Sequence, residues 1–222
     1  MGRVGRPAGL LLLTVAVVGI AAWLVFFSPV LGVREIQVVG NAGLSAEQVR
    51  QTARVAGGVP LATVDVAQVR ARIGAIPRVE SVKVSRTWPD TLRVEIVERE
   101  PVATVPSAGR SALMDRHGVV VEVRDVAPPV LPVLRVSRPG PRDPATTAAL
   151  GVIVALPGDL ARRVAEVLAP SAETVSLRLK DGREVVWGGG DRPAEKAKIL
   201  VTLLERRADS YDVSSPDVVI VK

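Results

Sequence analysis

The stretch VESVKVSRTWPDTLRVEIVE, residues 79–98, decides the fold of the first half of the chain. Apolar side chains occupy every second position from residue 82 to 84 and again from residue 92 to 96, on either side of the turn signal Trp88-Pro89-Asp90. A period of two is typical of strands, so the stretch predicts an antiparallel hairpin with one buried face. Because a single hairpin is marginal in water, a third strand is expected to join it.

Residues 33–39 are predicted to form this third strand, which ends at the turn signal Gly40-Asn41. Two short amphipathic helices are predicted between it and the hairpin. Ser45 and Asp65 are expected to be their N-caps, since each is followed three residues later by glutamine in a capping-box pattern. The sequence therefore predicts an α+β domain over residues 33–100, in the order β-α-α-β-β, with both helices on one side of the sheet.

A second α+β domain with an antiparallel sheet is predicted for residues 101–222. In residues 113–120, apolar residues on both sides of a polar turn indicate a hairpin. Asp143, followed by Pro144, is typical of a helix N-cap with proline at the first helical position. A second helical segment is predicted at residues 159–168.

The end of the chain is predicted to contain a hairpin, a helix and a last strand. In the hairpin, residues 175–187, a strict two-residue turn would place Leu179 opposite Glu184. The helix is expected over residues 193–207. Proline cannot donate to a strand ladder, so Pro216 places the last strand at a sheet edge or a bulge.

An uncharged run, residues 8–33, precedes both domains. Its length suffices to cross the roughly 30 Å hydrocarbon layer as a helix. We expect a short tail at 1–9 and a transmembrane helix at 10–32. Arg3 and Arg6 precede the run without a neighbouring acid, which favours a cytoplasmic N-terminus and an exported body.

A cleaved signal peptide is the alternative interpretation of this run. Gly19-Ile20-Ala21 is an acceptable small-x-small cleavage site. The apolar run nevertheless continues through Phe27, well past this site. We therefore favour a retained membrane anchor.

The composition excludes several kinds of site. The chain has no cysteine and one histidine, His117, which is expected in a polar turn. Only Trp88, Trp187 and Tyr211 are aromatic outside the anchor, which argues against nucleic-acid binding despite the net charge of +6. No serine elbow or phosphate-binding loop is present in the sequence. We predict no catalytic, cofactor-binding or metal-binding residues and no small-molecule substrate.

Several segments, taken in order, resemble one family. Residues 38–41 and 79–92 are similar to the POTRA domain of the FtsQ/DivIB cell-division family, and residues 97–103 to its join with a second domain. Residues 128–134 and 211–222 are similar to a connection and to the ending of that second domain. Abundant alanine, valine, arginine and glycine with few lysines further favours a high-GC source such as an actinobacterium.

The resemblance implies a non-catalytic scaffold of the bacterial divisome. Such a protein spans the cytoplasmic membrane once and acts at the division septum. Its implied partners are membrane division proteins of the FtsB/DivIC-like and FtsL-like kinds, with FtsW/FtsI-like proteins as further candidates, and through them septal peptidoglycan synthesis. Two alternatives stay open: a membrane-anchored POTRA-type chaperone and an unrecognised cell-wall ectoenzyme.

The last strand is the expected partner-binding surface. A strand at a sheet edge can accept a strand from another chain by β-augmentation. A competing interpretation is that the terminal valines simply complete the core. The predicted contact residues lie in this strand and the helix before it: Tyr211, Val213, Ser214, Val218, Val219, Ile220, Leu203 and Arg206.

Overall fold

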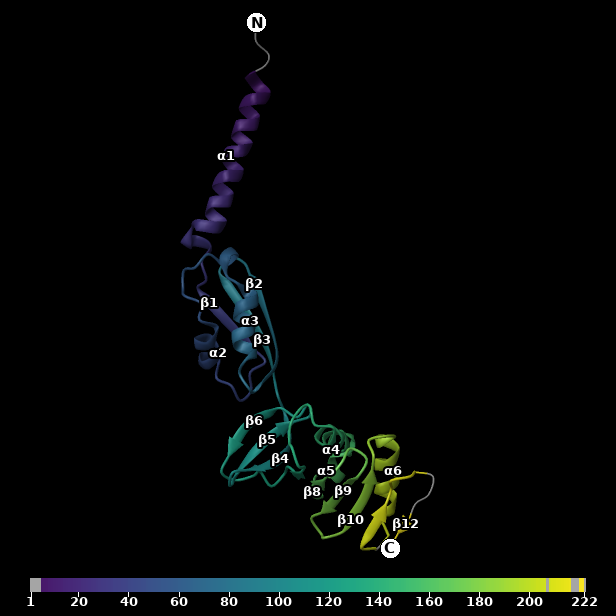
Figure 1. Ribbon diagram of the computed structural model, residues 1–222. Helices are drawn as coiled ribbons and strands as arrows, with labels where there is room; N and C mark the ends of the chain where they lie inside the picture. Colours follow the sequence, from purple (N-terminus) through teal and green to yellow (C-terminus); the bar gives the residue numbers. More distant parts are fainter. Residues whose placement is uncertain (1–4, 207, 217–219, 222) are drawn as a thin grey trace. The chain divides into compact units, whose positions relative to one another are not determined.

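The computed structural model describes residues 5–206, 208–216 and 220–221. The chain divides into two compact units, Met1–Glu98 and Arg99–Lys222 (Figure 1). The boundary that we predicted after Glu100 lies beside this division.

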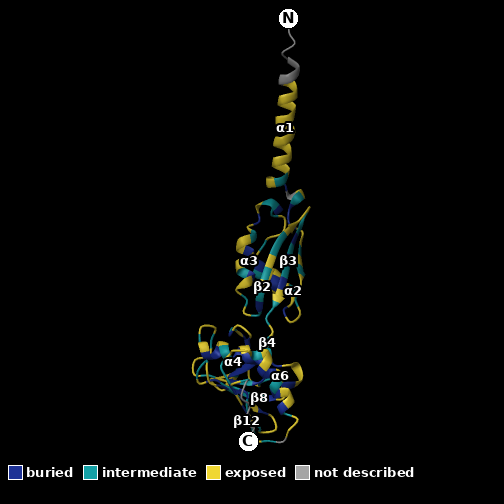
Figure 2. Cartoon of the chain, turned by 90° about the vertical axis from the view of Figure 1, so that its right-hand side faces the viewer, coloured by how far each residue is buried: buried dark blue, intermediate teal, exposed yellow. Residues whose placement is uncertain are grey.

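The first unit begins with an exposed apolar helix. Helix α1 covers Gly5–Phe27, and its segment Gly9–Phe27 has a mean hydropathy of 2.7. By length and composition this segment can cross a membrane, and its side chains are exposed (Figure 2). The helix ends before Ser28, whose hydroxyl accepts a hydrogen bond from the backbone two residues on, and the 3₁₀ helix η1 (Pro29–Leu31) follows. The predicted segment 10–32 therefore ends beyond the helix.

A three-stranded sheet forms the body of this unit, in the order β1-β3-β2. Strand β1 (Glu35–Val39) is parallel to β3 (Thr91–Glu98), which is antiparallel to β2 (Val79–Thr87). One core joins the strands to the helices α2 (Ala46–Ala53) and α3 (Val66–Gly74) and to the 3₁₀ helix η2 (Leu61–Thr63). The predicted order and the two helices are confirmed.

Both predicted N-caps form. The Ser45 hydroxyl accepts a hydrogen bond from the backbone of Gln48 at 3.1 Å, and the Asp65 carboxylate accepts one from Gln68 at 3.0 Å. Each bond satisfies a backbone donor that a helix start otherwise leaves unpaired. Short-range sequence patterns therefore determine where these helices begin.

The Glu98 carboxylate closes the loop between β1 and α2. It accepts hydrogen bonds from the backbone of Ala42, Gly43 and Leu44 at 2.6, 2.9 and 2.9 Å. Burial alone would raise the pKa of Glu98, but these bonds and the nearby Arg78 guanidinium outweigh burial and lower it. The ionised carboxylate at the end of β3 thus orders the entrance to α2.

The second unit is built on a nine-stranded sheet in the order β12-β11-β10-β9-β8-β7-β4-β5-β6. The pairs β4 with β7, β7 with β8 and β10 with β11 are parallel. The predicted α+β class is confirmed, but the sheet is mixed where we expected an antiparallel one. The strands are β4 (Pro101–Ser107), β5 (Arg110–Asp115), β6 (Val120–Arg124), β7 (Val133–Arg135), β8 (Val164–Leu168), β9 (Val175–Leu179), β10 (Glu184–Gly188), β11 (Ser210–Asp212) and β12 (Ile220–Val221).

Helices pack on this sheet and complete a second core. They are α4 (Pro144–Ala155), the single turn α5 (Gly158–Ala161) and α6 (Pro193–Leu203). The Asp143 carboxylate accepts the Thr146 backbone donor at 2.8 Å, so the predicted cap and the proline at the first helical position are both present. Trp187 and Tyr211 are the largest side chains in this core, and both have 0% exposure.

The helix predicted at 159–168 is wrong beyond its first turn. Residues 164–168 form β8, between β7 and β9. Val164 and Val167 are spaced as on a helix face, and both are buried. A register shift between Val164 and Glu166 allows residues three apart to face the same core in a strand.

Two further details of the second unit differ from prediction. Glu184 pairs with Arg178 and not with Leu179, because the Leu179 backbone instead bonds Arg183 across the turn. Helix α6 ends at Leu203, because tighter turns follow, including a bond from the Arg206 amide to the Leu203 carbonyl at 2.9 Å.

Candidate partner-binding surface

Strand β12 lies at one end of the sheet order. It pairs antiparallel with β11, with Tyr211 opposite Val221 and Asp212 opposite Ile220. No second neighbour of β12 exists among the described residues. Backbone groups on its outer edge are therefore available to a strand from another chain.

Strand β11, which pairs with β12, is held in place by Tyr211. The Tyr211 ring is buried, and its hydroxyl donates to the Arg206 carbonyl at 2.7 Å and accepts from Arg183 Nη1 at 3.0 Å. The Arg183 guanidinium also lies 5.7 Å from the ring centroid. This combination of apolar packing with a fully engaged hydroxyl fixes the strand.

Arg183 is itself positioned by the turn between β9 and β10. Its Nη2 and Nε atoms donate to Asp181 Oδ2 at 2.6 and 2.9 Å. The bond from Arg183 is the main cause that lowers the pKa of Asp181. The Asp181, Arg183 and Tyr211 side chains thus connect the β9–β10 turn to β11.

The chain after β11 is also fixed on the sheet. The Val213 amide donates to the Val186 carbonyl at 2.9 Å, and the Val213 side chain is buried. The Ser214 amide donates to Asp212 Oδ1 at 2.9 Å. Gly188 is required beside it, since its φ is +76° and an added Cβ would lie 2.8 Å from the Ser214 Cβ.

A buried lysine connects α6 to the turn after β10. Lys196 has 0% exposure, and its ammonium donates to the Gly189 carbonyl at 3.0 Å and to Asp191 Oδ1 at 2.9 Å. The bond from Lys196 is the main cause that lowers the pKa of Asp191. The ammonium therefore orders the glycine turn next to Ser214.

The structure separates the predicted contact residues into a supporting group and a surface group. Tyr211, Val213 and Leu203 are buried in the core, so their side chains support the surface and do not form it. Ser214 is half-buried and Arg206 is exposed. Ile220 belongs to β12, whereas Val218 and Val219 lie outside the described residues.

Sequence reasoning missed Arg183 and Lys196, which hold this surface together. A basic residue directly after the turn Asp181-Gly182 was the available signal for the first. For Lys196, the signal was a cation within the apolar stripe of a helix. Val201, on α6, is 45% exposed and adds apolar surface on that helix.

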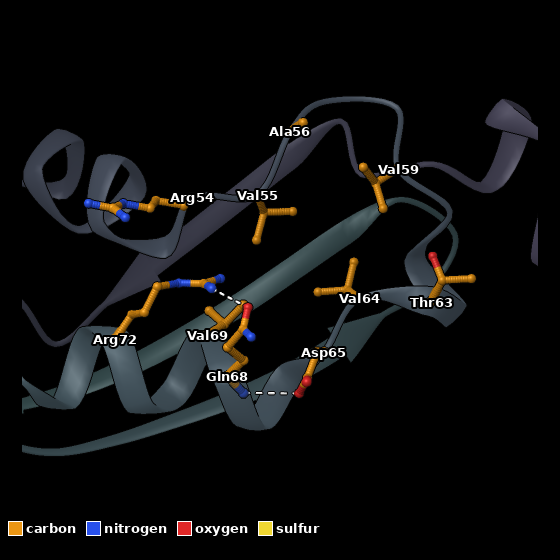
Figure 3. A pocket seen from close by; sticks show the side chains of 10 residues that line it. All are labelled: Arg54, Val55, Ala56, Val59, Thr63, Val64, Asp65, Gln68, Val69 and Arg72. Atoms are coloured by element: carbon orange, nitrogen blue, oxygen red, sulfur yellow. Dashed lines mark hydrogen bonds between the residues drawn. The ribbon is translucent and has the colours of Figure 1, made fainter.

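A hollow of about 280 Å³ lies in the first unit between α2, η2 and α3 (Figure 3). The valines that line it surround polar groups that form hydrogen bonds at the ends of helices. Asp65 caps α3, and Arg72 donates to Gln68 and to the Ala53 carbonyl at the end of α2. These polar groups support the helices, so the hollow is a weaker candidate site than the sheet edge.

The lone histidine lies in the β5–β6 turn, as predicted. The buried Asp115 carboxylate accepts from the backbone of His117 at 2.9 Å and of Val119 at 2.8 Å, and from Arg99 Nη1 at 2.6 Å. These contacts organise a turn. No group of three His, Cys, Asp or Glu side chains that could hold a metal ion was found in the described part of the chain.

A helix able to cross a membrane, followed by two α+β units of which the second has an open sheet edge among the described residues, is the arrangement of a membrane-anchored two-domain protein. Residues 31–99 match the model of the FtsQ-type POTRA domain, and residues 103–218 match the C-terminal domain of the cell division protein FtsQ/DivIB. The chain belongs to the FtsQ/DivIB family of cell division proteins.

Named relatives agree with this assignment and with an actinobacterial source. The chain is 43% identical to the cell division protein FtsQ of Mycobacterium tuberculosis, over 98% of this chain and 69% of that protein. Identity to FtsQ of Mycolicibacterium smegmatis is 45%, over 90% and 60%. For FtsQ of Streptomyces venezuelae it is 35%, over 93% and 81%.

Among solved structures, the chain is similar to the major extracytoplasmic domain of the cell division protein DivIB from Geobacillus stearothermophilus. The identity is 22% and the TM-score is 0.38, over 50% of this chain and 98% of that one.

Proposed function

We propose that this protein is a non-catalytic scaffold of the divisome that binds other membrane division proteins through the outer edge of β12. The partners are FtsB/DivIC-like and FtsL-like proteins, with FtsW/FtsI-like proteins as further candidates. Through them the scaffold is coupled to septal peptidoglycan synthesis. Family membership supports the cell-division role.

The observation that carries the proposal is the contrast between β11 and β12. Strand β11 has neighbours on both sides and is fixed by a buried tyrosine, whereas β12 is paired on one side only within the part of the chain that the structure describes. An edge strand that pairs with a firmly held neighbour is a suitable template for β-augmentation, because a strand from another chain can form backbone hydrogen bonds with it without rearrangement of the sheet. Val218, Val219 and Ile220 supply the contact segment, with Ser214 and Arg206 beside it.

The topology in the membrane is part of the proposal. Arg3 and Arg6 support a cytoplasmic N-terminus, with residues 1–9 as its tail and 10–32 as the anchor segment. The POTRA unit at 33–100 and the second domain at 101–222 then lie outside the cytoplasm, where the β12 edge meets the exported parts of other single-span proteins.

A truncation after Pro216 tests the proposal. It removes β12 but keeps Tyr211 and Val213, both of which the second core needs. The full chain and the truncated chain are each co-expressed with an FtsB/DivIC-like protein and purified from detergent. We expect the truncated chain to lose the partner while its circular dichroism spectrum, measured without the partner, stays that of the full chain.

A pair of proline variants locates the contact more narrowly. Ile220→Pro places a residue without an amide donor in β12, and Val123→Pro does so in β6, at the opposite end of the same sheet. We expect loss of the partner only with Ile220→Pro. Retention by both the truncated chain and Ile220→Pro would refute the edge-strand site.

A further inference from the structure

The β2–β3 turn lies at the membrane-tethered end of the first unit. Strands β1 and β3 are parallel, with Glu35 opposite Thr91, so both strands start at the same end of the sheet. The Asp90 carbonyl accepts from the Arg34 amide at 2.8 Å. The turn that precedes β3 is therefore adjacent to the segment that enters from the membrane helix.

The connection between the helix and this end of the sheet is short. Helix α1 ends at Phe27, and Gly32 already bridges to Pro60 in the folded body. Five residues can span at most about 18 Å. This end of the sheet consequently stays close to the bilayer that α1 crosses.

An exposed tryptophan occupies the turn at this end. Trp88 is 51% exposed, whereas Trp187 of the second unit has 0% exposure. Tryptophan combines a large apolar ring with one hydrogen-bond donor, which suits the interface between lipid headgroups and hydrocarbon. Val30, in the connection itself, is 62% exposed and adds apolar surface.

The base of the turn is firmly held. Arg86 donates to the Leu61 carbonyl at 2.8 Å and to the Val64 carbonyl at 2.7 Å. These bonds fasten η2 to the end of β2, immediately before the turn. Trp88 is thus presented on a supported hairpin.

We propose that the Trp88 turn lies in the headgroup region of the bilayer that α1 crosses. The lipid surface is its ligand, and the contact gives the POTRA unit a second attachment to the membrane besides its tether. This attachment restricts rotation of the unit about the tether. The proposal depends on the membrane span and not on the partner-binding role of β12.

Fluorescence of the full chain in lipid vesicles tests this contact. Trp23→Phe removes the tryptophan of the anchor, which leaves Trp88 and the buried Trp187 as the emitting residues. The protein is reconstituted at low density into phosphatidylcholine and phosphatidylglycerol vesicles with a lipid spin-labelled near the headgroup. We expect quenching of the Trp88 emission, and loss of that quenching when Trp88→Phe is added.

A relocated tryptophan provides the matched control. Val97 is 54% exposed and lies near the far end of β3, about 20 Å along the strand from Thr91. Val97→Trp, combined with Trp23→Phe and Trp88→Phe, is expected to escape quenching, and an unchanged circular dichroism spectrum verifies folding.

Two results would overturn the proposal. The first is an absence of quenching of Trp88 by the spin-labelled lipid. This result counts against the proposal both when the water-soluble quencher acrylamide reaches the ring and when another copy of the protein shields it. The second is equal quenching at Trp88 and at the relocated tryptophan.

Discussion

The loop before α2 in the POTRA unit and the β11 end of the second sheet are stabilised by different means. In the POTRA unit, carboxylate and hydroxyl groups bind loop and helix-start amides, as Glu98 does for residues 42–44. In the second unit, the end of the sheet depends on a buried ring, Tyr211, fixed by Arg183. The comparison indicates that the start of α2 in the POTRA unit is sensitive to loss of polar caps, whereas the β11–β12 edge of the second unit is sensitive to loss of core packing.

Tyr211→Ala should have the largest effect on stability. Deleting a buried aromatic ring leaves a cavity, so we expect the free energy of unfolding of the second unit to fall by about 4 kcal/mol. Tyr211→Phe keeps the ring but leaves Arg183 and the Arg206 carbonyl without their partner, and should cost about 1 to 2 kcal/mol. Urea denaturation in a Trp23→Phe, Trp88→Phe background, where Trp187 is the one tryptophan left, measures both by fluorescence. Equal losses for the two variants would contradict the role given to the ring.

Glu98→Gln should have the next largest effect, confined to the POTRA unit. Loss of a charged acceptor for three backbone amides is expected to cost about 2 kcal/mol. Hydrogen exchange of α2 in increasing urea measures it. Glu95→Gln, at a pair whose side chains are 40% exposed, is the control and should change stability by less than about 0.5 kcal/mol. A similar loss in both variants would show that the amide contacts of Glu98 are unimportant.

The pH dependence of the POTRA unit follows from the same carboxylate. The pKa of Glu98 is lowered in the folded chain, so its stabilisation is complete above the unfolded value, about 4.3, and is lost as the pH falls through the folded pKa. We therefore expect the urea midpoint of this unit to decline below about pH 4.5. The decline should be shallower in Glu98→Gln, and identical curves would exclude Glu98 as the titrating group.

Ser45→Ala should have the smallest effect of the series, about 1 kcal/mol in the POTRA unit, because one N-cap bond is lost. Hydrogen exchange of the first turn of α2 measures it directly. Thr52→Ala, at a half-buried position near the end of the same helix, is the control. An unchanged exchange rate in Ser45→Ala would show that the Glu98 contacts alone fix the start of α2.

How much could be predicted from the sequence also differs between the units. In the POTRA unit, caps and alternation act over a few residues, so the helices near Ser45 and Asp65 and the hairpin at 79–98 were predicted correctly. In the second unit, parallel pairs join distant segments. The apolar residues in 164–168 are spaced as in a helix, but the segment forms a strand because it pairs with a strand on each side.

The location of the candidate surface could be predicted from the sequence, but the side chains that form it could not. The alternation of Tyr211 and Val213 with polar residues shows that one face of the strand is buried. It does not show against which side of the sheet that face packs, or whether another strand pairs with the outer edge. The structure divides the predicted last strand into β11 and β12, which pair with each other, so Ile220 lies on the outer strand and Tyr211 on the inner one. The supporting contacts of Arg183 and Lys196 connect segments that local patterns do not relate.

Hydrogen–deuterium exchange of the full chain in detergent, with and without an FtsB/DivIC-like partner, tests the central claim most directly. If the partner adds a strand to β12, amides in the terminal segment should gain protection, while amides of β6, at the opposite end of the sheet, should not change. Protection at β6 or in the POTRA unit, with none in the terminal segment, would contradict the account.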